Sequence, residues 1–320
     1  MKKTVFFTLI VLMLLAAIFA SIKYNKNLHT SDGKITVVTT LFPLYDFAKH
    51  IGGEKVDVSL LLPPGVEPHS FEPTPGDIAR IHKANVFVFT GEFMEPWAHE
   101  IISGIDNKNI LIVDASTNVN LIPAAQLHEH GESEKHENHP HELTQMDPHI
   151  WLDFDNDKII IDNITSALIK SDSENSEYYQ HNADTLKKEI DALDKAYKDQ
   201  LGNCITRTIV FGGHYAFGYM ANKYNLNYLA AQGLSPDSEP TAQDLIDLVK
   251  QIRNDNIHYI FFEELTSPKI AETLANETNT KMLLLNAGHN VSRADLENNV
   301  SFISIMRKNL ENLKIGLECK

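Results

Sequence analysis

The stretch KITVVTTLFPLYDFAKHIGGEKVDVSLLLPP, residues 34–64, decides the fold class of this chain. It begins with an apolar segment, Ile35–Thr40, continues with an amphipathic segment, Pro43–Ile51, and ends with a second apolar segment, Val56–Leu62. Apolar segments without strict alternation are typical of strands buried on both faces. Two such strands joined by a helix form a βαβ unit with parallel strands. The stretch therefore predicts an α/β fold built on a parallel sheet.

The same alternation continues along the rest of the chain. In the first half we expect further strands and helices over Pro75–His82, Asn85–Thr90, Glu95–Ile105 and Ile110–Asp114. In the second half the pattern predicts four strands, at Arg207–Gly212, Asn227–Ala231, His258–Glu263 and Lys281–Asn286, and helices at Thr241–Asn254 and Asp295–Gly316. Between the halves lie two amphipathic helices, Asp157–Lys170 and Glu174–Leu201. The second of these would be about 40 Å long, and it has no Gly or Pro to bend it.

These patterns predict two similar α/β lobes joined by a long, stiff helix. We expect an N-terminal lobe over residues 34–170, a connecting helix over 171–202 and a C-terminal lobe over 203–320. Residues 21–33 are polar and without periodicity, which indicates a tether. A chain of 320 residues is long enough for two buried cores.

The N-terminus predicts export. Residues 1–20 begin Met-Lys-Lys and continue as an apolar run, 5–20, which is typical of a secretory signal. Two alternatives stay open at this point: cleavage after Ala20, or retention of residues 5–20 as a membrane anchor, although 16 residues are few for a spanning helix. In both cases the rest of the chain is periplasmic or extracellular.

Charge and cysteine content narrow the classes of function. The formal net charge of −15 argues against a nucleic-acid-binding protein, which needs a basic surface. The two cysteines, Cys204 and Cys319, favour a disulfide in an exported chain. Their alternative role, as thiolate metal ligands, is weakened by the position of Cys319 next to the C-terminus.

Four histidines predict a metal site. His69, His149, His214 and His289 each follow a predicted strand or a sharp turn. Ligands of open α/β sheets bind beyond the carboxyl ends of the strands, so these side chains are expected to meet between the lobes. Four neutral imidazoles complete a tetrahedral shell for Zn²⁺, whereas Mn²⁺ prefers carboxylate oxygens. A single histidine beside a strand is more often a hydrogen-bonded core residue, but four in this setting favour a zinc site.

Several motifs carry a resemblance to a known family. Residues 65–74 (GVEPHSFEPT), 147–153 (DPHIWLD) and 214–219 (HYAFGY) resemble the hallmarks of the zinc/manganese solute-binding proteins of ABC transporters. Residues 233–240 and 261–264 also resemble that family, and the likeness extends over nearly the whole chain from about residue 34. The resemblance implies two α/β lobes bridged by a long helix, with the metal in the cleft between them. It also implies delivery of the ion to a membrane permease driven by a cytoplasmic ATPase.

The resemblance assigns three ligands and leaves the fourth to be inferred. Family members supply three histidines, which match His69, His149 and His214 here. The fourth ligand in the family is an Asp, a Glu or water, whereas the matching loop of this chain contains His289 and no acidic residue. We expect His289 to be the fourth ligand, with alternatives at Glu67, Glu263 and Glu264.

Residues 125–146 interrupt the strand–helix alternation and predict a loop without regular structure. This segment contains five further histidines within a run of acidic residues: His128, His130, His136, His139 and His141. The composition favours an auxiliary loop that binds zinc weakly, because ordering a flexible loop costs conformational entropy. A solvated acidic loop with incidental histidines is the alternative. Similar His-rich loops occur in zinc-specific members of the family that the motifs resemble.

Two other functions compete with transport. A secreted zinc hydrolase needs three protein ligands, an open fourth position and a general base, which Glu67 or Glu263 would supply if His289 did not bind the metal. The chain lacks a His-Glu-x-x-His pair and a Gly-x-Ser-x-Gly elbow, which argues against hydrolysis. An adhesin is the third alternative. We expect a monomer with transported Zn²⁺ as its ligand, and Mn²⁺ as the alternative ion.

Overall fold

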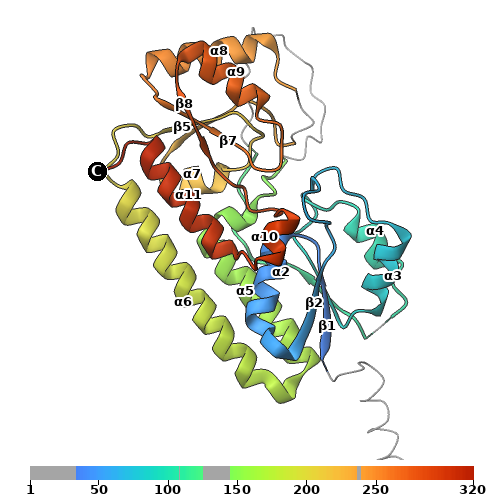
Figure 1. Ribbon diagram of the computed structural model, residues 1–320. Coiled ribbons are helices and arrows are strands. Elements are labelled where there is room, and N and C mark those ends of the chain that lie inside the picture. Colours follow the sequence, from blue (N-terminus) through green and yellow to red (C-terminus); the bar gives the residue numbers. More distant parts are fainter. Residues whose placement is uncertain (1–33, 108, 125–144, 236–238) are drawn as a thin grey trace, which may run out of the picture.

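The computed structural model describes residues 34–107, 109–124, 145–235 and 239–320 of the chain (Figure 1). The N-terminal lobe alternates strands with helices, as the sequence predicts. Its elements are β1 (Ile35–Thr39), α2 (Phe42–Gly52), β2 (Val56–Leu60), α3 (Pro75–Lys83), β3 (Val86–Phe89), α4 (Ala98–Ser103) and β4 (Leu111–Asp114). The four strands are parallel and lie in the order β2-β1-β3-β4. The predicted βαβ unit at residues 34–64 is therefore confirmed.

The C-terminal lobe repeats this arrangement. Its strands are β5 (Thr208–Phe211), β6 (Asn227–Ala230), β7 (Tyr259–Phe262) and β8 (Lys281–Leu284). They form a second parallel sheet in the order β6-β5-β7-β8, the same crossover pattern as in the first lobe. Three helices lie between or beside these strands, α7 (Gly218–Lys223), α8 (Ala242–Asn254) and α9 (Lys269–Thr278), and of these three only α8 is predicted from the sequence.

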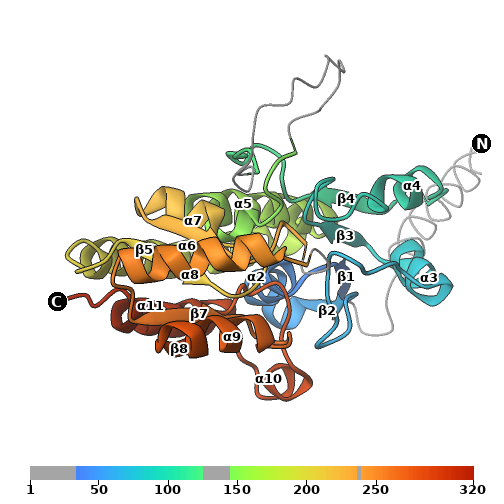
Figure 2. The ribbon, with the colours of Figure 1, turned by 90° about the horizontal axis from the view of Figure 1, so that it is seen from above.

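Two long helices connect the lobes. They are α5 (Phe154–Ser171) and α6 (Ser176–Leu201), close to their predicted ranges. Asp153 caps α5 by accepting a hydrogen bond from the amide of Asp155. Figures 1 and 2 show that α6 and α11 lie side by side on the flank of the molecule away from α3 and α4. The longer of the two helices, α6, therefore lies along both lobes.

The prediction of one helix over Asp295–Gly316 is wrong. The structure has two helices there, α10 (Arg293–Glu297) and α11 (Phe302–Gly316). Asn299 has a φ of 53°, a left-handed conformation that interrupts the helix. Ser301 then begins α11 with a capping box, in which its hydroxyl accepts from the amide of Ser304.

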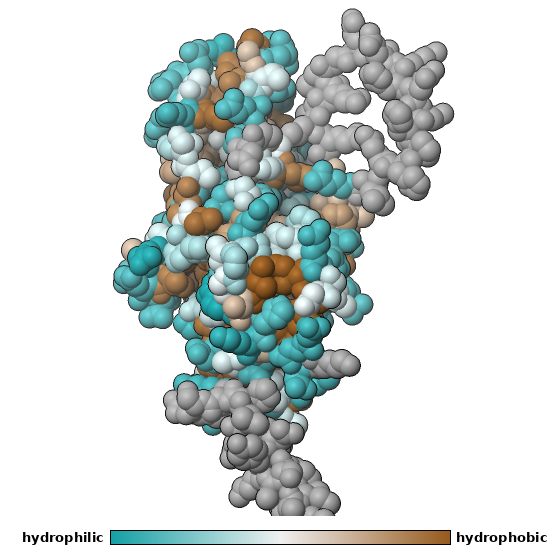
Figure 3. Space-filling view, turned by 90° about the vertical axis from the view of Figure 1, so that its right-hand side faces the viewer, coloured by the Kyte–Doolittle hydropathy of each residue, from teal (hydrophilic) through white to brown (hydrophobic). Residues whose placement is uncertain are grey.

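One hydrophobic core extends through both lobes. It includes Val86 in the first sheet, Trp151 and Tyr197 between the lobes, and Phe211 and Phe302 in the second half, all at most 1% exposed. Two smaller clusters fill the remaining space under the helices of each lobe. Hydrophilic residues cover most of the face that includes α3 and α4, with a compact hydrophobic area at mid-height (Figure 3). The shared core indicates that the connecting helices hold the lobes in a defined relation.

The predicted disulfide is confirmed. Cys204 and Cys319 are bonded, and they join the end of α6 to the C-terminus. The loop that this bond closes spans a sequence separation of 115 residues. It ties the segment after α11 to the start of the C-terminal lobe.

Some predictions fall outside the described residues. These are the signal or anchor at residues 1–20, the tether at 21–33, and the five histidines of the 125–146 loop. Among the helices that the structure describes, none is both long and apolar enough to cross a membrane.

Candidate metal centre

Three of the four predicted histidines meet in a tight triangle. The Nε2 atom of His149 lies 3.2 Å from Nε2 of His69 and 3.2 Å from Nε2 of His214. His149 and His214 are fully buried, whereas His69 is half-buried. Zinc–nitrogen bonds of 2.0–2.1 Å in a tetrahedron place neighbouring nitrogens about 3.3 Å apart. Two sides of the triangle therefore have the spacing of neighbouring nitrogens in a tetrahedral zinc shell.

Buried carboxylates hold two of these rings. Nδ1–H of His149 donates to Oδ1 of Asp147 at 2.7 Å, and Nδ1–H of His214 donates to Oε2 of Glu263 at 2.8 Å. In the neutral imidazole the proton is then on Nδ1, so that Nε2 carries a bare lone pair. The two lone pairs point at each other across 3.2 Å. This arrangement repels unless a cation lies between the nitrogens, and carboxylate–histidine pairs of this kind are typical of metal ligands.

His289 lies beside His214 in a second cluster of possible ligands that overlaps the first. It is 4% exposed, and its ring centre lies 5.9 Å from that of His214. His289, His214 and Glu263 place one ligand atom each within 4.8 Å of the others, as do His69, His149 and His214. The Nδ1 atom of His289 is buried without a hydrogen-bond partner among the described residues. An unpartnered buried nitrogen is costly, and coordination to an ion would remove that cost.

Loops carry these side chains, and His69, His214 and His289 lie in loops that follow strands, as the sequence predicts. His69 follows β2 in a turn in which Gly65 has a φ of 82°, a conformation that favours glycine. His149 immediately precedes a short 3-10 helix, Ile150–Leu152. His214 follows β5 after Gly213, where a Cβ atom would lie 2.8 Å from Oε2 of Glu263. The glycine thus leaves room for the carboxylate that holds the His214 ring.

Burial keeps His69, His149 and His289 neutral. Burial, and next the charge of His149, lowers the pKa of His69 to about 2. Burial, opposed by the charge of Glu263, lowers the pKa of His289 to about 3, and burial also holds the pKa of His149 well below its usual range. Neutral imidazole is the form that binds metal ions. Burial raises the pKa of Asp147 to about 7, against the backbone hydrogen bond from His149 that lowers it, and a bound cation would favour its ionised form.

The three acidic alternatives lie in different places. Glu263 is within reach of the site, with its Oε1 atom buried and free of hydrogen bonds among the described residues. Glu67 instead accepts a hydrogen bond from the backbone amide of His69 at 3.0 Å. Glu264 accepts a hydrogen bond from the side chain of Asn286, and burial, then the charge of Asp295, raises its pKa. Within the described part of the chain, neither Glu67 nor Glu264 belongs to a cluster of metal-ligating atoms.

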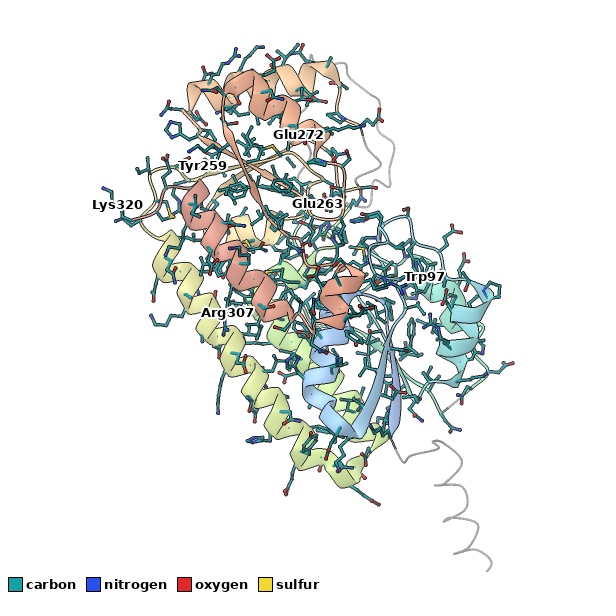
Figure 4. All side chains as sticks on the ribbon, viewed as in Figure 1. Trp97, Tyr259, Glu263, Glu272, Arg307 and Lys320 are labelled. Carbon is teal, nitrogen blue, oxygen red and sulfur yellow. A yellow bond between two sulfur atoms is a disulfide. The ribbon has the colours of Figure 1, made fainter. Side chains whose placement is uncertain are left out.

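The sequence patterns did not predict Asp147 as part of the site, and they did not predict that Glu263 orients His214. Asp147 is fully buried against His149, and its position two residues before a histidine was the signal. Glu263, expected only as an alternative ligand, hydrogen-bonds the His214 ring. In Figure 4 it lies at the edge of the C-terminal lobe that faces the N-terminal lobe.

Comparisons with known proteins identify the family. The family model described as zinc-uptake complex component A, periplasmic, matches residues 37–316. The high-affinity zinc uptake system protein ZnuA of Bacillus subtilis is 35% identical over 318 residues, covering 98% of this chain and 97% of that protein. The zinc-binding protein AdcA of Streptococcus pyogenes is also 35% identical, over 322 residues and 98% of this chain. The chain spans only 62% of the length of AdcA.

A solved structure agrees with these relatives. The Zn(II)-bound ZnuA-like domain of Streptococcus pneumoniae AdcA superposes with a TM-score of 0.75 at 31% identity, covering 89% of this chain and all of that one. The expected resemblance and the two-lobed fold are thereby confirmed. Because this family model matches nearly all of the chain that the structure describes, the chain belongs to the ZnuA family of zinc-uptake components.

Proposed function

We propose that this protein is an extracytoplasmic zinc-binding protein that captures Zn²⁺ between its lobes and delivers it to an ABC-type permease. The ligands are His69, His149, His214 and His289. The observation that supports this most strongly is the 3.2 Å spacing of the Nε2 atoms, with two of the rings held through Nδ1 by carboxylates. The named relatives are zinc uptake and zinc-binding proteins, which supports the same function here.

The donor set favours zinc over manganese as the transported ion. Four imidazole nitrogens suit a tetrahedral Zn²⁺ ion, whereas Mn²⁺ requires more donors and prefers oxygen. Among the described residues, Glu263 is the carboxylate grouped with these histidines as a possible ligand. Its Oε2 atom accepts from His214, which leaves only Oε1 as a donor to a metal ion. A closed shell of four protein ligands also leaves no position for a hydrolytic water, which supports a carrier over an enzyme.

Uptake in cells tests the function. In a strain without the gene for this protein, growth with a zinc chelator and ⁶⁵Zn uptake should both be impaired and should be restored by the wild-type gene. The gene for His149→Ala should restore neither, while added zinc should rescue every strain. Equal uptake with wild type and variant, at equal protein levels, would contradict the proposal. Rescue by manganese alone would identify the other ion as the cargo.

The carboxylate on His214 should matter for affinity. We expect Glu263→Gln to weaken zinc binding about 10- to 100-fold, because the neutral amide is a poorer acceptor for Nδ1–H and orients the ring less firmly. The matched control is Glu264→Gln, the next residue, which should stay within about twofold. Competition titration against a zinc chelator measures both. A larger effect at Glu264 would mean that the wrong carboxylate has been assigned.

The lowered pKa values predict few protons released on zinc binding. Three ordinary imidazoles with a pKa of 6.5 would carry about two protons at pH 6 and release them. Here His69, His149 and His289 are already neutral at that pH and release no proton, whereas Asp147 contributes about one proton at most. Asp147 must lose this proton for zinc to bind, so zinc affinity should fall only about fivefold as the pH falls from 7 to 6, less than three ordinary histidines would cause. Calorimetry in buffers of different ionisation enthalpy counts the released protons. A release of about three protons, two from the histidines and one from Asp147, would mean that the histidines face water before zinc binds.

A further inference from the structure

The loop that carries His289 is bonded to the opposite lobe. Residues 285–292 follow β8 and belong in chain order to the C-terminal lobe. The carbonyl of His289 nevertheless accepts a hydrogen bond from the amide of Phe42 at 3.1 Å, at the start of α2. The carbonyl of Ala287 accepts from the indole N–H of Trp151 at 2.7 Å. The main chain around His289 is therefore held by Phe42 and Trp151, both in the N-terminal lobe.

Asn290 makes two further connections to the N-terminal lobe. Its Nδ2 atom donates to the carbonyls of Pro63 at 2.9 Å and Val66 at 2.8 Å, residues 227 and 224 positions away. Its Oδ1 atom accepts from the amide of Val291 at 2.8 Å, while the carbonyl of Val291 accepts from the amide of Gly65 at 3.0 Å. The side chain is 1% exposed. Both amide protons and the oxygen of Asn290 are thus hydrogen-bonded away from water, where hydrogen bonds are stronger and keep the two loops in a fixed position.

These bonds join two ligand loops directly. Pro63 and Val66 belong to the turn that leads from β2 to His69, three residues beyond Val66. His289 immediately precedes Asn290. One amide side chain therefore fixes the distance between the backbones that carry two of the four ligands. The ring of His214 is held by Glu263, and both residues follow strands of the C-terminal lobe. The segment after His214 also meets the other lobe, because the hydroxyl of Tyr219 donates to the carbonyl of Asp147 at 3.0 Å.

We propose that Asn290 is a positioning residue that locks the His69 and His289 loops into one unit, so that both imidazoles reach the same zinc ion together. This inference rests on the proposed zinc-carrier function. It divides the site into three ligands carried with the N-terminal lobe (His69, His149 and His289) and one, His214, carried by the other lobe.

Two readouts separate positioning from simple stabilisation. Loss of the Asn290 amide should free the His289 loop, so zinc should dissociate faster. With Co²⁺ as the probe, the intense visible absorption of a tetrahedral ion should weaken as a ligand is lost or replaced by water. Asn312→Ala is the matched control, because Asn312 is also buried and donates at 2.8 Å to the carbonyl of Leu284, within the C-terminal lobe.

The experiment uses the whole protein. Zinc-loaded wild type, Asn290→Ala and Asn312→Ala are mixed with excess chelator in a stopped-flow instrument, and Co²⁺ spectra are recorded for each. We expect Asn290→Ala to release zinc about 10- to 100-fold faster with a weakened Co²⁺ band, and Asn312→Ala to match wild type in both. If Asn290→Ala does not fold, Asn290→Ser takes its place, because the shorter hydroxyl cannot reach both carbonyls.

The outcomes are distinguishable. Zinc release from the Asn290 variant within about twofold of wild type, with an unchanged Co²⁺ band, would overturn the positioning role and leave the carrier function standing. An equal acceleration in Asn312→Ala would overturn it as well, since the effect would then arise from any lost buried amide. Failure of the wild type to retain one zinc would overturn both proposals.

Discussion

Replacing His214 by alanine is expected to weaken zinc binding by about 10²- to 10³-fold. Zinc bound by four protein ligands gains about 10–16 kcal/mol, so one ligand contributes about 3–4 kcal/mol, and each 1.4 kcal/mol is a factor of ten. The variant also leaves Glu263, 4% exposed, without the ring that its Oε2 atom accepts from. Loss of a buried partner adds to the cost. Competition titration with a chelator of known affinity measures the change.

The control for this variant is His258→Ala. The His258 side chain is 52% exposed and pairs with Glu318 at 3.1 Å, in no contact with the site. We expect its zinc affinity to equal that of the wild type. A loss of less than about fivefold in His214→Ala would show that His214 is not a ligand and would reassign the centre to the remaining histidines.

Removing the disulfide is expected to lower the free energy of unfolding by about 2–5 kcal/mol. The bond between Cys204 and Cys319 closes a loop with a sequence separation of 115 residues, and cross-links over loops of this size restrict the unfolded chain strongly. The double variant Cys204→Ser/Cys319→Ser tests this in zinc-free protein, because bound zinc would add its own stabilisation. Denaturant unfolding measures the difference.

Zinc affinity should not change in this double variant. The disulfide joins the end of α6 to the C-terminus, and neither cysteine belongs to the clusters of possible metal ligands. A fall in affinity larger than about threefold would indicate that the bond also sets the relation of the lobes. An unfolding free energy equal to that of the wild type would contradict the structural role of the disulfide.

Local patterns were sufficient to predict most of the fold. The strand Val86–Phe89 is buried at every position, which explains why its sequence reads as an unbroken apolar run. The break between α10 and α11 was not predictable in the same way, because Leu296, Val300 and Phe302 continue the apolar pattern across it. Only the left-handed Asn299 and the cap at Ser301 end one helix and begin the next.

The site was predictable as a set of residue types but not as a geometry. His69, His149 and His214 stand in short motifs, and the structure brings them together. The partners of these rings depend on contacts that no local pattern contains: His214 meets Glu263 across 49 residues, and Asn290 meets Pro63 across 227. Those long-range contacts decide which groups orient the ligands and which lobe carries His289.

X-ray absorption at the zinc edge tests the central claim most directly. For protein loaded with one equivalent of Zn²⁺, we predict four nitrogen neighbours at about 2.0–2.1 Å with the outer-shell pattern of imidazole rings. In His289→Ala the pattern should correspond to three imidazoles, with oxygen in the fourth position. A wild-type shell with a carboxylate or water oxygen, unchanged in the variant, would contradict the four-histidine centre and assign the fourth position to another group.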